Sequence, residues 1–377
     1  MPRLVALDLA GGPTFVTALR RCLDDGDAAW PVDQRLPKPQ REALFALLAP
    51  GAYVGGDGRV EPLPGGRPTE EGDALVVATS GTTGHPRGVV LSLDAVRASA
   101  AATSERLGVD PASDRWLCCL PVAHIGGLAL VLRALLTGTA LEVHPGFDTA
   151  AVLDALDRGA TLVSLVPTAL YRLGEESKRF RTVVLGGSAP PDTLADNVVT
   201  TYGLTESGSG VVYDGRPLRD VEVRVADTGE ISLRAPMLGR VYRDGTALRD
   251  ADGWFATGDA GALREDGRLA VDGRIAEVIV TGGEKVWPAP VEAVLSGLPG
   301  VREVAVCGVP DDEWGARVVA FLVCEAGVRP SLEECREAVR AELAPWASPK
   351  QLVFVDELPR TSIGKVRRQE LVARAAQ

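Results

Sequence analysis

The pattern of apolar and polar residues along the chain changes near residues 73, 211 and 274. Before residue 73, a helical pattern at 13–26 is followed by connectors rich in Pro and Gly. From 73 to about 200, short apolar runs alternate with segments of helical periodicity. The pattern predicts strands at 73–79, 115–121, 140–145 and 160–167, and helices at 93–108, 126–138 and 148–159. This alternation is typical of an α/β sheet with crossover helices.

From about 211 to 271 the pattern becomes one of short alternating runs separated by Asp-Gly pairs. The pairs lie in the segments YDGRP, RDGTA, ADGW, EDGRL and VDGRI. Asp-Gly accommodates the positive φ angles of tight hairpins, so these pairs predict turns between short strands. We therefore expect a β-rich subdomain here.

After Arg274 the α/β texture returns and continues to the C-terminus. Strand-like runs such as REVAVCGV and RVVAFLVC alternate with helical segments such as SLEECREAVRAELA. A segment of about 100 residues is large enough to fold as a domain. The sequence thus predicts an α/β protein with a large N-terminal domain, 1–273, that includes the β-rich subdomain, and a small α+β C-terminal domain, 274–377.

Composition and charge exclude several classes of protein. The 377 residues carry a formal charge of −11, which argues against a nucleic-acid-binding coat. The six cysteines and three histidines show no zinc-ligand spacing, which favours reduced thiols in a cytoplasmic protein. The longest apolar stretch, 125–136, contains Arg133 and is too short to span a bilayer, and the N-terminus does not resemble a signal peptide.

The segment LVVATSGTTGHPRGVVLS, residues 75–92, places small hydroxyl and glycine residues between two predicted strands. Backbone N–H groups and hydroxyls of such a loop can converge on an anion, and Arg87 adds a full charge. The P-loop pattern GxxxxGK[ST] does not fit, because no Gly-Lys-Ser/Thr occurs. Phosphate binding and a plain hairpin loop are both compatible with this segment.

Three later segments distinguish these alternatives when they are taken together. They are TTYGLTESG (200–208), WFATGDAG (254–261) and RTSIGKVRR (360–368). Each taken singly is compatible with an ordinary loop, hairpin or basic tail. In this order, with the loop at 75–92, they resemble the adenylate-forming enzymes: acyl-CoA synthetases, luciferases and the adenylation domains of peptide synthetases. The resemblance extends from about residue 73 to residue 370.

This resemblance implies binding sites for ATP and Mg²⁺. It assigns the β- and γ-phosphates to a loop in which the family usually has Lys where Arg87 stands. It assigns Glu206 to Mg²⁺ as a hard oxygen ligand and Thr205 to the α-phosphate. The implied ATP-binding residues are Thr79, Ser80, Gly81, Thr82, Thr83, Gly84 and Arg87 for the phosphates, Gly186, Gly187, Ser188, Ala189, Tyr202 and Gly203 for adenine, and Asp259 and Arg274 for ribose.

The resemblance also implies a catalytic lysine and a CoA site. The ammonium of Lys365 would stabilise the charge that develops when a carboxylate attacks the α-phosphate. Only 5 of the 40 Lys and Arg residues are lysines, so a retained Lys fits a site that needs a compact charge. The C-terminal domain would then rotate about residues 274–277 and present Gly282 and Gly283 to CoA. Ala276 departs from the polar residue that the family often has at this hinge.

For the acid, PVAHIGGLALVLRALLTG and YGLTESGSGVVYDGRPL most resemble the o-succinylbenzoate–CoA ligase family of menaquinone biosynthesis. The resemblance places His124 with the catalytic residues at the mouth of an acyl pocket, and Ser207, Gly208 and Ser209 against the acid. A buried structural histidine is the alternative for His124. The sequence identifies no arginine as the partner of the second carboxylate.

Three other functions remain open at this stage. The chain could be another aryl or short-chain acyl-CoA ligase, or a stand-alone adenylation enzyme that loads a carrier protein. It could also be a non-catalytic nucleotide-binding protein, although the retention of Glu206, Asp259 and Lys365 argues against a decayed site. The expected partners are a small carboxylic acid, ATP and CoA, with no nucleic acid or membrane span; both monomer and homodimer remain open.

Overall fold

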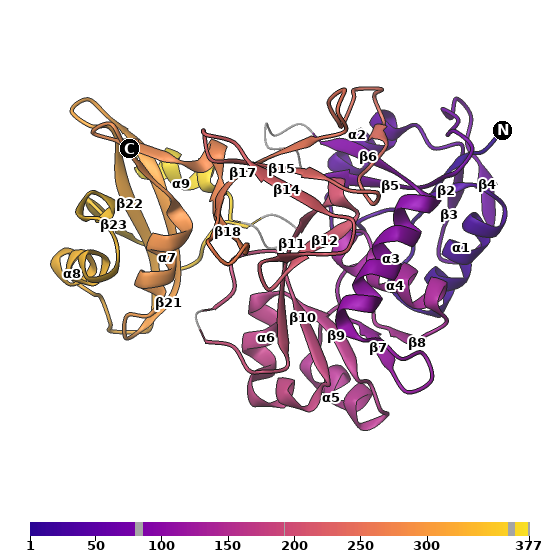
Figure 1. Cartoon of the computed structure of the whole chain (residues 1–377), viewed down its shortest axis with the longest axis horizontal. Helices are drawn as coiled ribbons and strands as arrows, with labels where there is room; N and C mark the ends of the chain where they lie inside the picture. Colours follow the sequence, from indigo (N-terminus) through magenta and orange to yellow (C-terminus); the bar gives the residue numbers. More distant parts are fainter. Residues whose placement is uncertain (80–85, 192, 361–365, 376–377) are drawn as a thin grey trace. The chain divides into compact units, whose positions relative to one another are not determined.

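The structure, a computed structural model, describes residues 1–79, 86–191, 193–360 and 366–375 (Figure 1). By their contacts the residues form two compact units. The first comprises Met1–Arg224, Ser232–Ala256 and Arg264–Leu269, and the second comprises Val225–Ile231, Thr257–Leu263 and Ala270–Gln377. The predicted mixed α/β class, with a larger N-terminal part and a smaller C-terminal part, is confirmed. The domain boundary between residues 273 and 274 stays a prediction.

Two seven-stranded sheets form the framework of the first unit (Figure 1). Sheet A has the order β16 (Val241–Tyr242), β6 (Arg87–Ser92), β5 (Asp73–Thr79), β2 (Ala28–Pro31), β1 (Leu4–Leu7), β3 (Ala52–Val54), β4 (Val60–Pro62). Sheet B has the order β13 (Arg216–Pro217), β12 (Ser209–Tyr213), β11 (Val198–Leu204), β10 (Thr182–Leu185), β9 (Leu162–Leu165), β7 (Arg115–Cys118), β8 (Ala140–Val143). Strands β11, β10, β9, β7 and β8 of sheet B run parallel. Their carboxyl ends therefore lie at one edge of the sheet.

The helices of the first unit bury the apolar faces of these sheets. Helices α5 (Thr149–Asp157) and α6 (Pro167–Leu173) pack on sheet B, and α2 (Lys38–Leu48) packs on sheet A. Helix α3 (Leu93–Leu107) contacts strands of both sheets, and α4 (Ile125–Thr137) packs against α3 and sheet B. Helix α1 (Pro13–Asp24) contacts β1 and β2, and the 3₁₀ segment η1 (Gly174–Arg179) follows α6. The central strands β7, β9 and β10 of sheet B are buried on both faces, as is usual for a parallel sheet covered by helices.

The second unit contains a five-stranded sheet with helices on both faces (Figure 1). The strands are β19 (Ile279–Thr281), β20 (Glu284–Val286), β21 (Val301–Asp311), β22 (Gly315–Cys324) and β23 (Gln351–Phe354). Side chains alternate across β21 and β22, so that one face packs on α7 (Pro288–Ser296) and α8 (Leu332–Glu342). The other face packs on α9 (Arg368–Ala375). The short 3₁₀ segments here are η3 (Ile275–Glu277) and η4 (Pro345–Ala347).

The predicted β-rich stretch is confirmed, with one difference in detail. Strands β14 (Glu222–Val225), β15 (Glu230–Arg234), β17 (Phe255–Leu263) and β18 (Leu269–Arg274) form a four-stranded sheet in that order. The pair Asp214-Gly215 forms the expected turn, with φ of 49° and 75°. Asp272-Gly273 instead lies inside β18, where Gly273 has a φ of 141°. Among the helices that the structure describes, none is long and apolar enough to cross a membrane.

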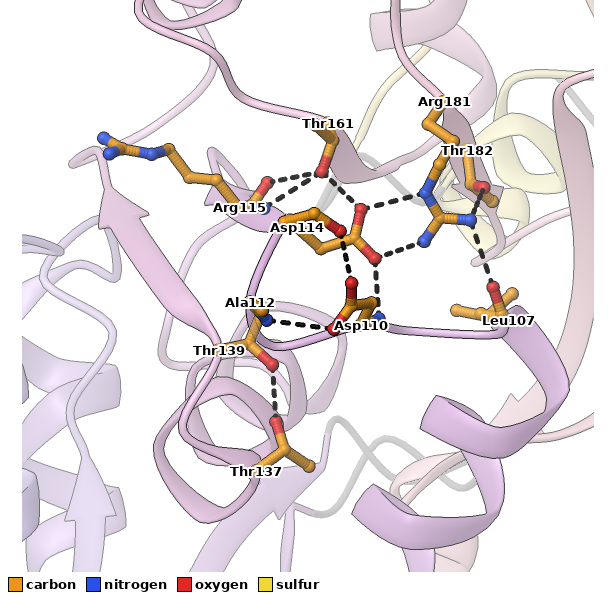
Figure 2. Close-up of polar contacts among 11 residues, drawn as sticks. Leu107, Asp110, Ala112, Asp114, Arg115, Thr137, Thr139, Thr161, Arg181 and Thr182 are labelled. Atoms are coloured by element: carbon orange, nitrogen blue, oxygen red, sulfur yellow. Dashed lines mark hydrogen bonds and ion pairs between the residues drawn. The ribbon is translucent and has the colours of Figure 1, made fainter.

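A polar network ties together the amino ends of three parallel strands of sheet B (Figure 2). Asp114 lies just before β7, and Arg181 lies just before β10. The Asp114 carboxylate accepts hydrogen bonds from the Arg181 guanidinium at 2.9 and 2.6 Å. It also accepts from the Thr161 hydroxyl at 2.8 Å, just before β9, and from the Asp110 N–H at 2.9 Å. Burial alone would raise the pKa of Asp114, but these hydrogen bonds outweigh it and lower the pKa. The network holds the edge of sheet B opposite the carboxyl ends of its strands.

We predict that Asp114→Ala lowers the free energy of unfolding by about 2–3 kcal/mol at pH 7, because several charge-assisted hydrogen bonds are lost. A lowered pKa stabilises the fold above the unfolded-state value of about 3.9, and this stabilisation disappears as pH falls through the folded-state pKa. The difference between the two proteins should therefore shrink below about pH 4. Urea unfolding between pH 7 and pH 3 measures it, with the exposed Asp57→Ala as the control. A difference that does not change with pH would contradict this role.

Candidate functional site

The predicted site residues of the first unit gather at the carboxyl edge of sheet B. Gly186 and Gly187 follow β10, and Thr205 and Glu206 follow β11 in the 3₁₀ turn η2 (Thr205–Ser207). His124 follows β7 and immediately precedes α4. In α/β sheets, ligands bind at the carboxyl ends of the strands, so topology alone brings these three segments to the edge where a ligand would bind.

The predicted phosphate loop connects β5 and β6 of sheet A. Its two flanking residues are paired across this hairpin: Thr79 lies opposite Arg87, and the Thr79 hydroxyl donates a hydrogen bond to the Arg87 carbonyl at 3.4 Å. Ser80, Gly81, Thr82, Thr83 and Gly84 lie outside the described residues, as does Lys365. Their predicted roles stay predictions.

Sheets A and B are joined at Glu206. The backbone N–H of Gly239, just before β16, donates a hydrogen bond to the Glu206 carbonyl at 2.7 Å. The Tyr242 hydroxyl donates to Glu206 Oε1 at 3.3 Å, and the Arg87 guanidinium stacks on the Tyr242 ring, 3.6 Å from its centroid. Asp244 pairs with Arg87 at 3.5 Å. The structure thus brings together Arg87 and Glu206, which are 119 positions apart in the chain.

The turn after β11 is closely packed. A Cβ at Gly203 would lie 2.0 Å from the Ser209 carbonyl oxygen, so only glycine fits. Ser207 is fully buried, and its hydroxyl bonds within the turn to the Leu204 and Ser209 backbones. Ser209 has a φ of 147°, which is unusual for a residue with a side chain. Ser207 therefore holds the turn in shape, and a contact of Ser207, Gly208 or Ser209 with an acid stays a prediction.

The predicted adenine segment begins at the end of β10. Gly187, Ser188 and Ala189 are exposed, while Gly186 and Tyr202 are half-buried. Tyr202 lies in β11, next to β10 in the sheet. Adjacent strands therefore supply both parts of this predicted subsite.

A charged cluster that was not predicted from the sequence surrounds His124. Arg35 donates to the Asp33 carboxylate through Nε and Nη2 at 2.8 and 2.9 Å, and Arg35 Nη2 lies 2.8 Å from His124 Nε2. His124 Nε2 also lies 3.2 Å from Asp33 Oδ2. Burial alone would raise the pKa of Asp33, but the hydrogen bonds with His124 and Arg35 lower it well below its usual range. His124 thus forms a polar triad with Asp33 and Arg35, and its role toward an acid stays a prediction.

A small apolar pocket, with room for about one water molecule, is lined by Ile125, the residue after His124. Ile125, Ala129 and Leu132 line it from one face of α4, and Gly208 lines it from the turn after η2. The remaining lining residues come from β5 and α3: Leu75, Val96, Ser99 and Ala100. Small side chains from both helices leave this space, which we call the α3–α4 pocket.

Asp259 and Arg274, the predicted ribose pair, lie in the second unit. Asp259 is buried, and the Arg274 Nε lies 2.9 Å from its Oδ1. The guanidinium also donates to the Thr257 carbonyl at 2.9 Å, and the Thr257 hydroxyl donates to the Ile231 carbonyl at 2.7 Å. Arg274 thus orients the Asp259 carboxylate directly.

The predicted CoA-binding glycines form a hairpin turn in the second unit. Gly282 and Gly283 connect β19 and β20 with φ of 58° and 85°, as a two-residue turn with two positive φ angles requires. The Gly282 N–H bonds to the Trp314 carbonyl at 2.9 Å, and a Cβ on Gly282 would meet the Trp314 ring at 2.9 Å. The hairpin explains why both residues are glycine, and their contact with CoA stays a prediction.

Within the described residues, no group of three or more His, Cys, Asp and Glu side chains could hold a metal ion. The half-buried Glu206 carboxylate, which accepts a hydrogen bond from Tyr242, can supply one hard oxygen ligand. Mg²⁺ in nucleotide-dependent enzymes is usually held by one or two carboxylates together with substrate phosphates. The residues present therefore fit a metal ion that arrives with ATP.

Comparison with families and known proteins assigns the chain to a family. A model of the AMP-binding enzymes matches residues 16–245, and a model of the AMP-binding enzyme C-terminal domain matches residues 290–365. The chain is 40% identical over 397 residues to a probable 2-succinylbenzoate–CoA ligase of Mycobacterium tuberculosis, covering 97% of each chain. It is 36% identical over 329 residues to 2-succinylbenzoate–CoA ligase of Listeria monocytogenes, covering 80% of this chain and 70% of the relative.

Solved structures agree with this result. The o-succinylbenzoate CoA synthetase (MenE) from Bacillus subtilis, in complex with the acyl-adenylate intermediate OSB-AMP, superposes with a TM-score of 0.87 at 27% identity, covering 98% of this chain and 87% of that one. The amide bond synthetase McbA from Marinactinospora thermotolerans also gives a TM-score of 0.87 at 27% identity, with coverage of 99% and 90%. The resemblance inferred from the motifs is confirmed: the chain belongs to the AMP-binding, adenylate-forming enzymes.

Proposed function

We propose that this protein converts o-succinylbenzoate to o-succinylbenzoyl-CoA, with ATP and CoA as co-substrates, in menaquinone biosynthesis. The observation that carries the proposal is the 40% identity over 97% of both chains to a probable 2-succinylbenzoate–CoA ligase. As an AMP-forming acid–thiol ligase, it would release pyrophosphate in a first step and AMP in a second. Because McbA, an amide bond synthetase, shares the fold, the fold alone selects neither the acid nor the nucleophile.

In the first step, a carboxylate oxygen of the acid attacks the α-phosphorus of ATP, and the bond to the pyrophosphate oxygen breaks. Arg87 would offset charge on the departing phosphates, and Thr205 would donate to the α-phosphate. Lys365 would stabilise the charge that develops between the two anions. Mg²⁺, held in part by Glu206, would neutralise phosphate charge. In the second step, the CoA thiolate attacks the acyl carbon and AMP leaves.

The triad of Asp33, Arg35 and His124 provides a partner for the second carboxylate of the acid. Arg35 is fixed by Asp33 through one side of its guanidinium, and its side chain remains 43% exposed. A ring carboxylate of the acid at the exposed side of Arg35 would pair with the guanidinium.

We also propose a cytoplasmic location. The expected substrates ATP and CoA are supplied there, and all six cysteines are free, five of them buried. Monomer and homodimer remain open.

The proposed reaction is tested by pyrophosphate release with ATP and Mg²⁺, comparing o-succinylbenzoate with benzoate, acetate and a medium-chain acid, with and without CoA. We expect turnover with o-succinylbenzoate, a CoA thioester as the product, and a loss of at least about 100-fold in Lys365→Ala, because a charge that stabilises the transition state is removed. Lys178→Ala, which removes an exposed lysine paired with Glu175, is the control. Turnover with a different acid alone would refute the substrate, and amide or carrier-bound products would refute the acceptor.

Substitution Arg35→Gln tests recognition of the second carboxylate. We expect KM for o-succinylbenzoate to rise about tenfold or more, because a charge-assisted hydrogen bond is lost, while KM for ATP and CoA is unchanged. A matched acid without the ring carboxylate should show no such change. Arg41→Gln, which removes an arginine paired with Asp8, is the control. An equal loss for both acids would show that Arg35 only supports the fold.

Asp259→Asn tests the ribose site. The carboxamide keeps the shape of the side chain but loses the charge that two ribose hydroxyls would contact, so ATP and AMP should both bind about 10–100-fold more weakly by calorimetry. Asp272→Asn, in strand β18, is the control. Unchanged binding of both nucleotides would exclude Asp259 from their site.

A further inference from the structure

The short strand β16 is held firmly against the edge of sheet A by two arginines. Arg240 donates to the Asp73 carboxylate at 3.0 Å through both Nε and Nη2, and to Glu70 at 2.8 Å. Arg243 donates to the carbonyls of Leu48 at 3.1 Å and Pro68 at 2.9 Å, and to that of Arg67. Burial and the nearby Arg67 lower the pKa of Arg243 to about 10, which still leaves it charged at neutral pH. These anchors fix the backbone on both sides of Tyr242.

Tyr242 projects from this fixed strand toward the two charged residues of the candidate site. Its ring lies 3.6 Å from the Arg87 guanidinium carbon, and its hydroxyl donates to Glu206 at 3.3 Å. Burial, and next the charge of Glu206, raise the pKa of Tyr242 to about 12. The hydroxyl is therefore a hydrogen-bond donor throughout the neutral range. One side chain thus contacts both the cation and the carboxylate.

We propose that Tyr242 is a positioning residue that holds Arg87 and Glu206 in the arrangement required by the β- and γ-phosphates of ATP and their Mg²⁺; this rests on the proposed function. A guanidinium is planar and stacks on an aromatic ring, whereas an ammonium is a compact, strongly hydrated charge. Tyr242 and Asp244 therefore form a site that fits the arginine guanidinium better than a lysine ammonium. This explains why position 87 carries Arg where the family usually has Lys.

The contacts of Tyr242 with Arg87 and Glu206 also keep these two charged groups from pairing directly with each other. Arg87 lies on the face of the ring, and Glu206 lies at its hydroxyl end. Opposite charges in direct contact would each be less available to a ligand. Because the Tyr242 phenol contacts both groups, the Arg87 guanidinium can still bind phosphate oxygens, and one Glu206 carboxylate oxygen can still bind a cation. Asp244 is nearly half exposed, so its pairing with Arg87 at 3.5 Å contributes less than the stacking.

The test compares the binding of ATP and AMP by calorimetry, without acid or CoA. In Tyr242→Leu, which loses both contacts, ATP should bind about three- to tenfold more weakly, while AMP, which lacks the β- and γ-phosphates, should bind as before. Tyr242→Phe keeps the stacking and loses the hydroxyl. It should bind ATP normally at saturating Mg²⁺ but require a higher Mg²⁺ concentration for half-maximal ATP binding.

A double-mutant cycle separates positioning from a general structural effect. Arg87→Lys should weaken ATP binding in the wild-type background and have little further effect in Tyr242→Leu. If Tyr242→Leu does not fold, as judged by thermal unfolding, the test rests on the Mg²⁺ requirement of Tyr242→Phe, which keeps the ring and loses only the hydrogen bond to Glu206. Tyr53→Phe is the control, because it removes a tyrosine–carboxylate hydrogen bond to Asp8 elsewhere on sheet A.

Equal weakening of ATP and AMP, unchanged ATP binding and Mg²⁺ requirement, or additive effects of the two substitutions would each overturn the inference. These outcomes do not depend on which acid the enzyme uses. A wild-type protein that binds ATP but does not activate o-succinylbenzoate would refute the proposed substrate and leave this inference intact. A wild-type protein that binds no ATP would overturn both.

Discussion

The hydrogen bond from the Gly239 N–H to the Glu206 carbonyl, 2.7 Å long, joins the two large sheets at the candidate site. Around it, a Cβ at Gly208 would lie 3.0 Å from the Met237 carbonyl oxygen, so the turn after β11 fits closely against the segment that leads into β16. Sheet A carries Arg87 and sheet B carries Glu206. Without this junction the two charges would belong to separate layers. Their proximity is therefore a consequence of how the sheets meet.

The same junction explains how the two charges can serve different partners. Tyr242 stacks under the cation and donates to the carboxylate, while Arg240 and Arg243 fix its strand from outside the site. Farther along the edge of sheet B, Asp33 orients Arg35 beside His124 and the α3–α4 pocket. The first unit thus holds two charged centres, of which we propose that one binds phosphates and the other a carboxylate.

Sequence patterns predicted those helices and strands whose hydrophobic periodicity is visible within one continuous segment. The strands and helices from β5 to β9 were predicted from periodicity, whereas β1 was not, because Leu4–Leu7 is a run of only four residues without alternation. The family motifs pointed to Arg87, Glu206 and Asp259, whose roles stay predictions. Tyr242 and Arg35 were not identified, because they reach the site through strand pairing and loop packing between distant segments. The hydroxyl of Ser207 similarly could not be assigned to the turn from its position in a motif.

The central claim is that the chain forms an adenylate of o-succinylbenzoate. The most direct measurement is exchange of radiolabelled pyrophosphate into ATP with o-succinylbenzoate and Mg²⁺, in the absence of CoA. We expect rapid exchange with this acid and little with benzoate or acetate, because reversal of adenylation regenerates ATP only when the acyl-adenylate forms. A folded protein that binds ATP but shows no exchange with o-succinylbenzoate would not be an o-succinylbenzoate-activating enzyme.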